Sequence, residues 1–396
     1  MPEAAAREYE IVVYGASGFT GALTAEYLAR NAPGLRWALA GRNQGKLETV
    51  RSRLAEIDPA LAALPIITAD IGEPASLAAM AAATQVVITT VGPYLSYGEP
   101  VVAACAAAGT DYVDLTGEPE FVDRMWLGYH AEAQRTGARL VHACGFDSIP
   151  HDLGVLFTVG QLPEGLPLRI EGFVRAGGTF SGGTYHSAVG AMARLRQGRQ
   201  AAGERRRREA RPAGRRVSGI VGPPRRVPAA GGWALPMPTI DPQIVLRSAA
   251  ALDRYGPDFR YGHYLAVRRL PVAAGLVAGT GTLLAMSQLP PTRKLLLKLK
   301  DPGAGPSPEE REKAWFKVRF IGEAHNPADG PARVITEVAG GDPGYGETSK
   351  MLAETALSLA RDELPATAGQ VTTAVALGQA LIDRLSAAGI SFTRVE

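Results

Sequence analysis

The feature that most constrains the fold is a short apolar run at residues 9–14 that passes directly into a glycine-rich loop. The run, YEIVVY, predicts a buried strand. Glycines spaced as GxxGxxG between a strand and a helix allow a tight turn, close approach of the backbone to a pyrophosphate, and packing of helix on strand. The N-terminus of the following helix offers unpaired N–H groups to phosphates. The sequence therefore predicts a dinucleotide site. The loop consists of Gly15, Ala16, Ser17, Gly18, Phe19, Thr20 and Gly21.

Expected strands and helices alternate after this loop. Alternation at this pace indicates a parallel, doubly wound sheet, so the fold class is α/β of the Rossmann type. We expect the cofactor-binding domain to cover residues 1–150. The expected strands are 9–14, 35–40, 64–69, 85–90, 111–114 and 139–143, and the expected helices are 19–31, 43–56, 74–83, 98–108 and 119–136.

The pattern changes after residue 150. Period-two runs predict strands at 167–176, 315–323 and 332–340, which fit a mixed or antiparallel sheet better than further βαβ units. We expect an α+β domain for substrate binding and dimerisation over 151–345. Helices are expected at 347–362 and 371–387, within a C-terminal part (346–396) that packs back on the first domain.

The end of the second expected strand selects the nucleotide. An acidic residue there would bind the ribose hydroxyls of NAD, whereas this chain has Arg42, Asn43 and Lys46. Arg42 and Lys46 lie one helical turn apart, so both can face a 2′-phosphate. No carboxylate occurs between Glu26 and Glu48. The pattern favours NADPH over the alternative that both cations are ordinary surface charges.

Two later segments complete the expected cofactor site. Asp70, after the third strand, is expected near the adenine. Thr90, Val91 and Gly92, after the fourth, are expected beside the ribose and nicotinamide, because glycine at the carboxyl end of a strand suits a loop lying flat against a ligand.

Charge, cysteine content and missing motifs argue against several classes of protein. The 42 basic and 39 acidic residues give a net charge of +3, which provides no reason to expect nucleic-acid binding. The two cysteines cannot form a disulfide framework, and the N-terminus lacks an apolar run, so a cytoplasmic protein is expected. The six histidines and two cysteines show no metal-ligand spacing, so no metal is expected. A GxSxG motif is absent, which argues against a serine hydrolase.

Two stretches have unusual composition. Residues 194–216 contain ten arginines against two glutamates; we expect a solvated, mobile loop, with a docking patch for an acidic carrier protein or anionic lipid as the alternative. Residues 270–289 contain no charge and have basic flanks at Arg268, Arg269, Arg293 and Lys294. A buried helix or acyl-pocket wall is the preferred interpretation; peripheral membrane contact and a transmembrane span are the alternatives.

Several motifs resemble those of one family. The motifs are VYGASGFTG, AGRN, VGPY, YVDLTGE (112–118), GFDSIPHDLG (145–154) and SGGT (181–184). In this order they resemble the saccharopine-dehydrogenase-like oxidoreductases over almost the whole chain, and most of all the bacterial trans-acting enoyl reductases. The resemblance implies an NADPH-linked reductase of a polyketide or lipid-like acyl chain carrying a carbon–carbon double bond. The arginine-rich segment departs from a typical member, which puts the choice of partner in doubt.

Three residues are candidates for the chemistry. Tyr94, after the Gly-Pro turn, is the first choice as proton donor, with packing against the cofactor as the alternative. His186 can titrate near neutral pH, although a lone histidine is more often structural. Asp147 belongs to a polar group with Ser148, His151 and Asp152; this group either positions substrate or caps the helix that begins near Pro150.

Three functions remain open on the sequence alone. The leading hypothesis is an NADPH-dependent reductase of an apolar acyl or lipid-like substrate, carried by an acidic protein or free. A C–N or C=O oxidoreductase of a small polar metabolite is the second, and a non-catalytic NADPH-binding protein on lipid surfaces is the third. We expect a homodimer, because second domains built on a sheet often pair.

Overall fold

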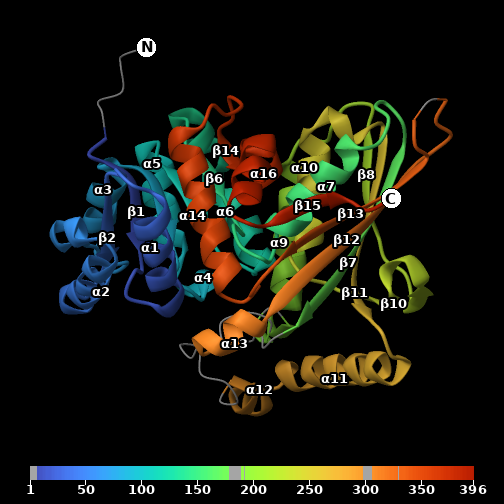
Figure 1. Cartoon of the computed structure of the whole chain (residues 1–396), viewed down its shortest axis with the longest axis horizontal. Helices are drawn as coiled ribbons and strands as arrows, with labels where there is room; N and C mark the ends of the chain where they lie inside the picture. Colours follow the sequence, from blue (N-terminus) through green and yellow to red (C-terminus); the bar gives the residue numbers. More distant parts are fainter. Residues whose placement is uncertain (1–6, 178–188, 191, 298–305, 329) are drawn as a thin grey trace.

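The structure is a computed structural model that describes residues 7–177, 189–190, 192–297, 306–328 and 330–396. Two sheets lie side by side, with helices between them and around the first (Figure 1). One continuous apolar core, which includes Val13 of the first sheet and Phe320 of the second, joins them.

The first sheet is parallel, and its described strands follow the order β14-β6-β5-β4-β1-β2-β3. The order reverses at β1, which pairs with β2 on one side and β4 on the other. Ligands of such sheets bind at this switch point, outside the carboxyl ends of the strands. The predicted Rossmann-type α/β fold is confirmed. The strands are β1 Tyr9–Tyr14, β2 Trp37–Gly41, β3 Ile66–Thr68, β4 Thr84–Thr89, β5 Asp111–Asp114, β6 Arg139–Val141 and β14 Gly369–Val371.

Helices cover both faces of this sheet. Helix α14 comes from the C-terminal part of the chain and packs on α1, β1 and β4. The helix expected at 371–387 is instead β14 followed by two shorter helices. The helices around the sheet are α1 Phe19–Asn31, α2 Gln44–Ile57, η1 Pro59–Ala63, α3 Pro74–Ala82, α4 Tyr94–Tyr97, α5 Glu99–Ala108, α6 Pro119–Thr136, α14 Gly346–Arg361, α15 Thr373–Ala376 and α16 Gly378–Ala387.

The second sheet is mixed, as the period-two runs predicted. Its described strands follow the order β15-β13-β12-β7-β11-β10-β9, and β8 pairs with β11. β7 pairs in parallel with β11 and antiparallel with β12. The strands are β7 Leu168–Gly177, β8 Arg216–Ile220, β9 Arg225–Val227, β10 Gly232–Pro236, β11 Asp258–Val267, β12 Trp315–Ala324, β13 Arg333–Gly340 and β15 Ser391–Arg394.

Helix α7 connects the two sheets. It follows β6 of the first sheet and packs on β12 and β13 of the second, while α10 packs on α7 and β11. The junction therefore lies at the carboxyl edge of the first sheet, where a cofactor would meet a substrate. The helices of this part are α7 Ile149–Gly160, α9 Leu195–Arg208, η2 Pro228–Ala230, α10 Asp241–Ala251, η3 Asp253–Tyr255, α11 Leu270–Gln288, α12 Pro290–Leu297 and α13 Pro308–Lys313.

The expectation of a mobile arginine-rich loop is wrong. Residues 195–208 form α9, which packs on α6. Carboxylates on α6 compensate the charge: Arg194 pairs with Glu120, and the buried Arg205 pairs with Asp123 at 2.5 Å. A like-charged run can fold when its charges have partners elsewhere in the chain, which composition cannot show.

The preferred interpretation of residues 270–289 is also wrong. They form α11, but only 11% of the residues in its most apolar stretch of 18 are buried. The helix packs mainly on α12 and touches β10 and β11 of the second sheet, while most of its surface is exposed (Figure 1). Its length and apolar composition would also suit a membrane span. Apolar composition indicates that a segment leaves water without indicating what it packs against.

Candidate active site

The glycine loop has the geometry that its spacing predicts. Gly15 has a φ of +87°, and a Cβ there would lie 2.7 Å from Val91 Cγ2. A Cβ on Gly21 would overlap the carbonyl oxygen of Gly15. Thr90 Oγ1 donates to that same carbonyl at 3.2 Å, which ties the loop to the end of β4. The backbone is therefore exposed where a pyrophosphate has to approach it.

The N-terminus of α1 faces this loop without competing groups. Its N-cap is Gly18, and no side chain from the described residues caps it. Its first turn contains no acidic residue. The first N–H groups and the positive end of the helix dipole therefore stay available to phosphate oxygens.

The predicted 2′-phosphate cations are both exposed. Arg42 follows β2, and Lys46 lies on the first turn of α2. Within the described part of the chain, neither side chain takes part in an ion pair or side-chain hydrogen bond. Asn43 is the N-cap of α2, and its side-chain oxygen accepts from the Lys46 N–H at 3.0 Å. Asn43 therefore orients the helix, while the two cations remain free for an anion.

The other cofactor candidates lie along the same edge. Val91, after β4, is half-buried, and Gly92 is exposed. Asp70, after β3, accepts from the Gly72 N–H at 2.8 Å and lies near Tyr14, the last residue of β1. Burial and Asp70 raise the pKa of Tyr14, and the charge of Arg42 opposes that rise.

Tyr94 is placed in the interior of the domain. Its hydroxyl donates to the Thr89 carbonyl at 3.1 Å and accepts from the Leu115 N–H at 3.1 Å. Burial, and then the charge of Asp114, raise its pKa well above the ordinary value. Both hydrogen-bonding positions of the hydroxyl are used by backbone, so the geometry favours a packing role over proton donation.

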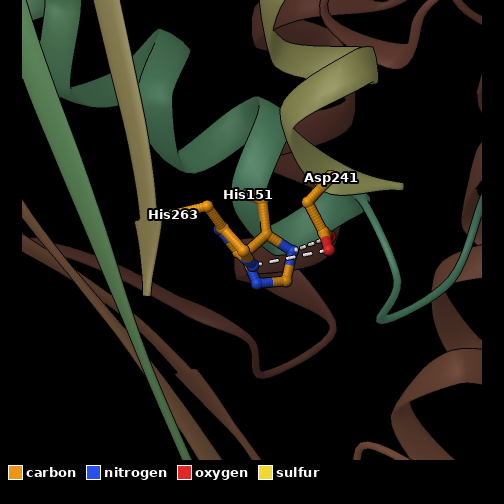
Figure 2. Close-up of side chains that lie close together, drawn as sticks. All are labelled: His151, Asp241 and His263. Atoms are coloured by element: carbon orange, nitrogen blue, oxygen red, sulfur yellow. Dashed lines mark ion pairs between the residues drawn. The ribbon is translucent and has the colours of Figure 1, made fainter. Parts of the chain in front are cut away.

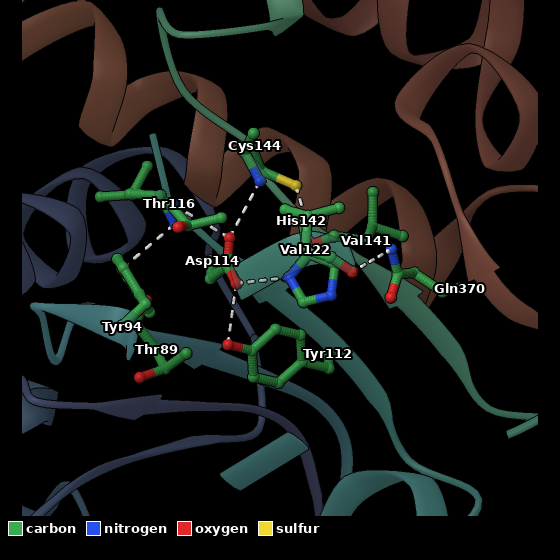
Figure 3. A network of polar contacts seen from close by, with 12 residues as sticks. Thr89, Tyr94, Tyr112, Asp114, Thr116, Val122, Val141, His142, Cys144 and Gln370 are labelled. Atoms are coloured by element: carbon green, nitrogen blue, oxygen red, sulfur yellow. Dashed lines mark hydrogen bonds and ion pairs between the residues drawn. The ribbon is translucent and has the colours of Figure 1, made fainter. Parts of the chain in front are cut away.

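Asp114, which lies in the motif YVDLTGE, organises the adjoining edge of the sheet, although no role was expected for it. Its carboxylate accepts from the Tyr112 hydroxyl at 2.9 Å and from the Ala143 N–H at 2.9 Å, and it lies 2.6 Å from His142 Nδ1 (Figure 3). The residue is fully buried. These contacts tie the end of β5 to the segment that follows β6. A buried acid beside a histidine far along the chain is visible only in three dimensions.

Asp147 is the best-placed acid among the sequence candidates. It lies in the turn between β6 and α7, and a Cβ on Gly117 would lie 3.0 Å from its Oδ2. Burial, and then the nearby charge of Asp241, raise its pKa to about 6. A carboxyl group with that pKa can be protonated near neutral pH and can donate a proton at the carboxyl edge of the sheet.

Ser148 and Asp152 have structural roles. Ser148 occupies the N-cap position of α7, but its hydroxyl donates to the Asp147 carbonyl at 2.5 Å, so the expected side-chain cap is not formed. Asp152 accepts from Ser248 at 2.5 Å and from Thr373 at 2.7 Å. Asp152 thereby joins α7 to α10 and α15. His186, the third catalytic candidate, lies outside the described residues.

A buried His–Asp–His cluster lies beside this group. His151 of α7, Asp241 of α10 and His263 of β11 meet there (Figure 2). His151 Nδ1 lies 2.7 Å from Asp241 Oδ1, and His263 Nε2 lies 3.5 Å from Asp241 Oδ2. Burial would raise the pKa of Asp241, but the two histidines outweigh it and lower that pKa. Burial lowers the pKa of His263 to about 4, so its ring is neutral at physiological pH.

The cluster adjoins Asp147 through Phe146, whose ring makes an edge contact with His151 at 5.6 Å between centroids. Of these three residues, only His151 belongs to a group of candidates predicted from the sequence. The others lie 90 and 112 residues further along the chain, so no spacing rule could connect them.

Comparisons with known proteins agree with this geometry. The saccharopine dehydrogenase NADP-binding domain matches residues 11–141. A trans-acting enoyl reductase of Mycobacterium ulcerans is 37% identical over 418 residues, which cover 98% of this chain and 97% of that protein. A trans-acting enoyl reductase of Mycobacterium tuberculosis is 38% identical over 419 residues, with the same coverage.

A solved structure has the same fold. The apo saccharopine dehydrogenase (L-Glu forming) of Saccharomyces cerevisiae superposes with a TM-score of 0.57 at 12% identity. The match covers 98% of this chain and 100% of the yeast chain. At this identity the likeness concerns the arrangement of both sheets and carries no information about substrate.

Proposed function

The chain belongs to the trans-acting enoyl reductases of the saccharopine-dehydrogenase-like family, NADP-dependent oxidoreductases, and we propose that it reduces the carbon–carbon double bond of an apolar acyl substrate. The observation that carries the proposal is the glycine loop at the switch point with two free cations beside it. Gly15 exposes the backbone to a pyrophosphate, and Arg42 and Lys46 provide charge for a 2′-phosphate.

The reaction requires a hydride and a proton. NADPH supplies the hydride to the β-carbon of an enoyl thioester when it is bound, and the α-carbon takes a proton. In the proposed mechanism the Asp147 carboxyl donates that proton and is later reprotonated from solvent. Its position near Gly117 and its raised pKa support this assignment. The product is the saturated thioester and NADP⁺.

Isotope tracing tests the proposal. The protein is incubated with NADPH deuterated at the transferable C4 position and a 2-enoyl thioester, and the product is examined by mass spectrometry. One deuterium at the β-carbon of a saturated acyl chain supports the proposal. Carbonyl and imine substrates are offered in parallel. Deuterium on the carbinol or amine carbon of their products, with none on the enoyl product, would replace the proposal with the alternative of a C=O or C–N reductase.

We also propose that α11 rests on an anionic membrane surface, where an apolar substrate would be concentrated. Leu276 and Val277 are 40% and 51% exposed, and Leu270 is 53% exposed. Burying a side chain of this kind contributes about 1.5–3 kcal/mol, so leaving several in water is costly. The basic pairs at 268–269 and 293–294 flank the helix and suit anionic headgroups.

The topology argues for a helix lying in the surface rather than crossing the membrane. The chain enters α11 from β11 and returns to β12, and both strands flank β7 in one sheet. A single crossing would leave the return segment on the far side. Residues 290–314 contain many charges, including Arg293, Lys294 and Asp301, so they cannot make a second crossing.

Vesicle sedimentation tests the contact. The wild type is expected to sediment with phosphatidylglycerol vesicles more than with phosphatidylcholine vesicles. The double variant L276S/V277S is expected to stay in the supernatant, whereas L195S, on the exposed face of α9, sediments like the wild type. Equal sedimentation of both variants would refute the assignment to α11.

The remaining partners are further proposals. Arg206, Arg207 and Arg208 form the exposed end of α9 and suit an acidic carrier protein. A charge-reversing triple variant is expected to raise KM for a carrier-bound substrate while leaving KM for a free thioester unchanged.

We propose that the protein is a cytoplasmic, membrane-peripheral homodimer. Light scattering after gel filtration measures its mass, and a monomeric mass would exclude the dimer.

A further inference from the structure

The His151–Asp241–His263 cluster has the composition of a transition-metal site. Two imidazoles and one carboxylate offer ligand atoms that all lie within 4.8 Å of one another. The three residues are 1%, 1% and 5% exposed. Two histidines and one carboxylate form a common protein ligand set for Zn²⁺, with a fourth position left to water.

Hydroxyl groups next to the cluster contact two of its three side chains. The Tyr261 hydroxyl lies 3.0 Å from His263 Nδ1, which leaves Nε2 facing the cluster. Thr239 donates its hydroxyl to Asp241 Oδ2. In metalloproteins, hydrogen bonds of this kind on the far side of a ligand fix its orientation and tautomer.

Two ring nitrogens of the cluster have no hydrogen-bond partner among the described residues. They are His151 Nε2 and His263 Nε2, and both are buried. Buried polar atoms are nearly always satisfied, so two such nitrogens beside one carboxylate call for a ligand.

We propose that His151, Asp241 and His263 bind one Zn²⁺ ion at the junction of the two domains. The His151 Nδ1–Asp241 Oδ1 separation of 2.7 Å is that of a pair sharing a proton. Metal binding replaces that proton and moves the two atoms apart to ~3.3 Å, the spacing of ligands on a tetrahedral ion. The site is separate from the glycine loop, but Asp241 also acts on Asp147, so its test does not use turnover.

The ion would act as a clamp. Its ligands come from α7, α10 and β11, so it would fix the helix that leaves the first sheet against the second sheet. A ligand that binds only the folded state raises stability in proportion to the logarithm of its concentration. The melting temperature should therefore rise with zinc and fall with a chelator.

Zinc content and calorimetry test the site without using turnover. Tag-free protein is stripped with a chelator, titrated with ZnCl₂, desalted and measured by elemental mass spectrometry. About one equivalent is expected for the wild type, and less than about a tenth for D241N and H263Q. Cobalt absorption in the visible region reports the geometry of the same site.

Two variants serve as matched controls. H325Q removes a histidine near the surface, and H142N alters a second buried His–Asp pair, His142 with Asp114. Both are expected to keep about one zinc. Circular dichroism checks that each variant is folded, and H151N offers a second way to remove a ligand if D241N unfolds.

Two results would overturn the proposal and leave the cluster as a proton-sharing ion pair. One is a wild-type protein that holds no zinc after titration, and the other is an equal loss of zinc in H325Q. NADPH binding is measured separately, so its loss would concern the proposed function alone.

Discussion

Gly21 lies directly against the carbonyl oxygen of Gly15, so a single methyl group cannot be added between them. The helix α1 can therefore approach the loop closely only with glycine at this position. G21A is expected to displace the loop and to weaken NADPH affinity by at least about tenfold, or ~1.4 kcal/mol. Calorimetric titration measures this. G128A, in the middle of α6 with open space around it, is the control and should bind normally.

The cation pair beside the loop predicts a change of nucleotide preference. Hydrogen bonds to charged groups contribute about 1.5–3 kcal/mol each, so R42A/K46A should lose roughly 100-fold or more in NADPH affinity and little in NADH affinity. R30A, an exposed arginine at the far end of α1, should change neither. Equal losses for both nucleotides would remove the assignment of a 2′-phosphate site.

Asp147 predicts a stability that depends on pH. Its folded pKa is raised from 3.8 to about 6, so the folded state binds more protons than the unfolded state between these values, and stability falls as pH rises through the window. At pH 7.5 the penalty approaches ~3 kcal/mol. D147N should remove this loss and be more stable than the wild type above pH 6.

The same variant separates stability from catalysis. D147N should lower kcat by roughly 10²–10⁴-fold if the carboxyl donates the proton. D383N, on the exposed face of α16, should change neither quantity. Urea unfolding at several pH values and the pH profile of kcat are the measurements. An unchanged kcat in D147N would exclude it as the donor.

For Tyr94 we expect the opposite result, a loss of stability with little change in kcat. Y94F removes the acceptor of the buried Leu115 N–H, which should cost about 1–3 kcal/mol of stability. Because the hydroxyl is already used by backbone, kcat should stay within about threefold, far from the effect of losing a general acid. Y97F, at an exposed position, controls for the substitution. A large loss of kcat would restore Tyr94 as proton donor.

Arg205 is expected to be essential for stability. Its side chain is 8% exposed and pairs with Asp123, which is 1% exposed. Removing one partner of a buried pair leaves an uncompensated charge, so R205A should destabilise the protein by about 3–5 kcal/mol. R206A, one residue along and exposed, should change stability by less than about 0.5 kcal/mol. Urea denaturation distinguishes the two.

The sequence predicted best where function depends on local order along the chain. The strand, the glycine loop and α1 are contiguous, so their geometry could be inferred from residues 9–31 alone. Arg42 and Lys46 follow the same logic, since one helical turn separates them.

Prediction from the sequence failed where the interacting residues come from distant segments of the chain. Arg205 is buried because acids on α6 compensate it, and composition around residue 205 cannot show this. The zinc ligands proposed here lie 90 and 22 residues apart and meet only because α7, α10 and β11 pack together. The expectation for α11 failed for a different reason, because most of its apolar surface stays exposed in the described part of the chain.

The most direct test of the central claim is titration of the wild-type protein with NADPH and with NADH by calorimetry. The account predicts one site per chain that binds NADPH at least about 100-fold more tightly than NADH, or ~2.7 kcal/mol. Equal affinity would contradict the roles of Arg42 and Lys46. Binding of neither nucleotide would contradict the reductase itself.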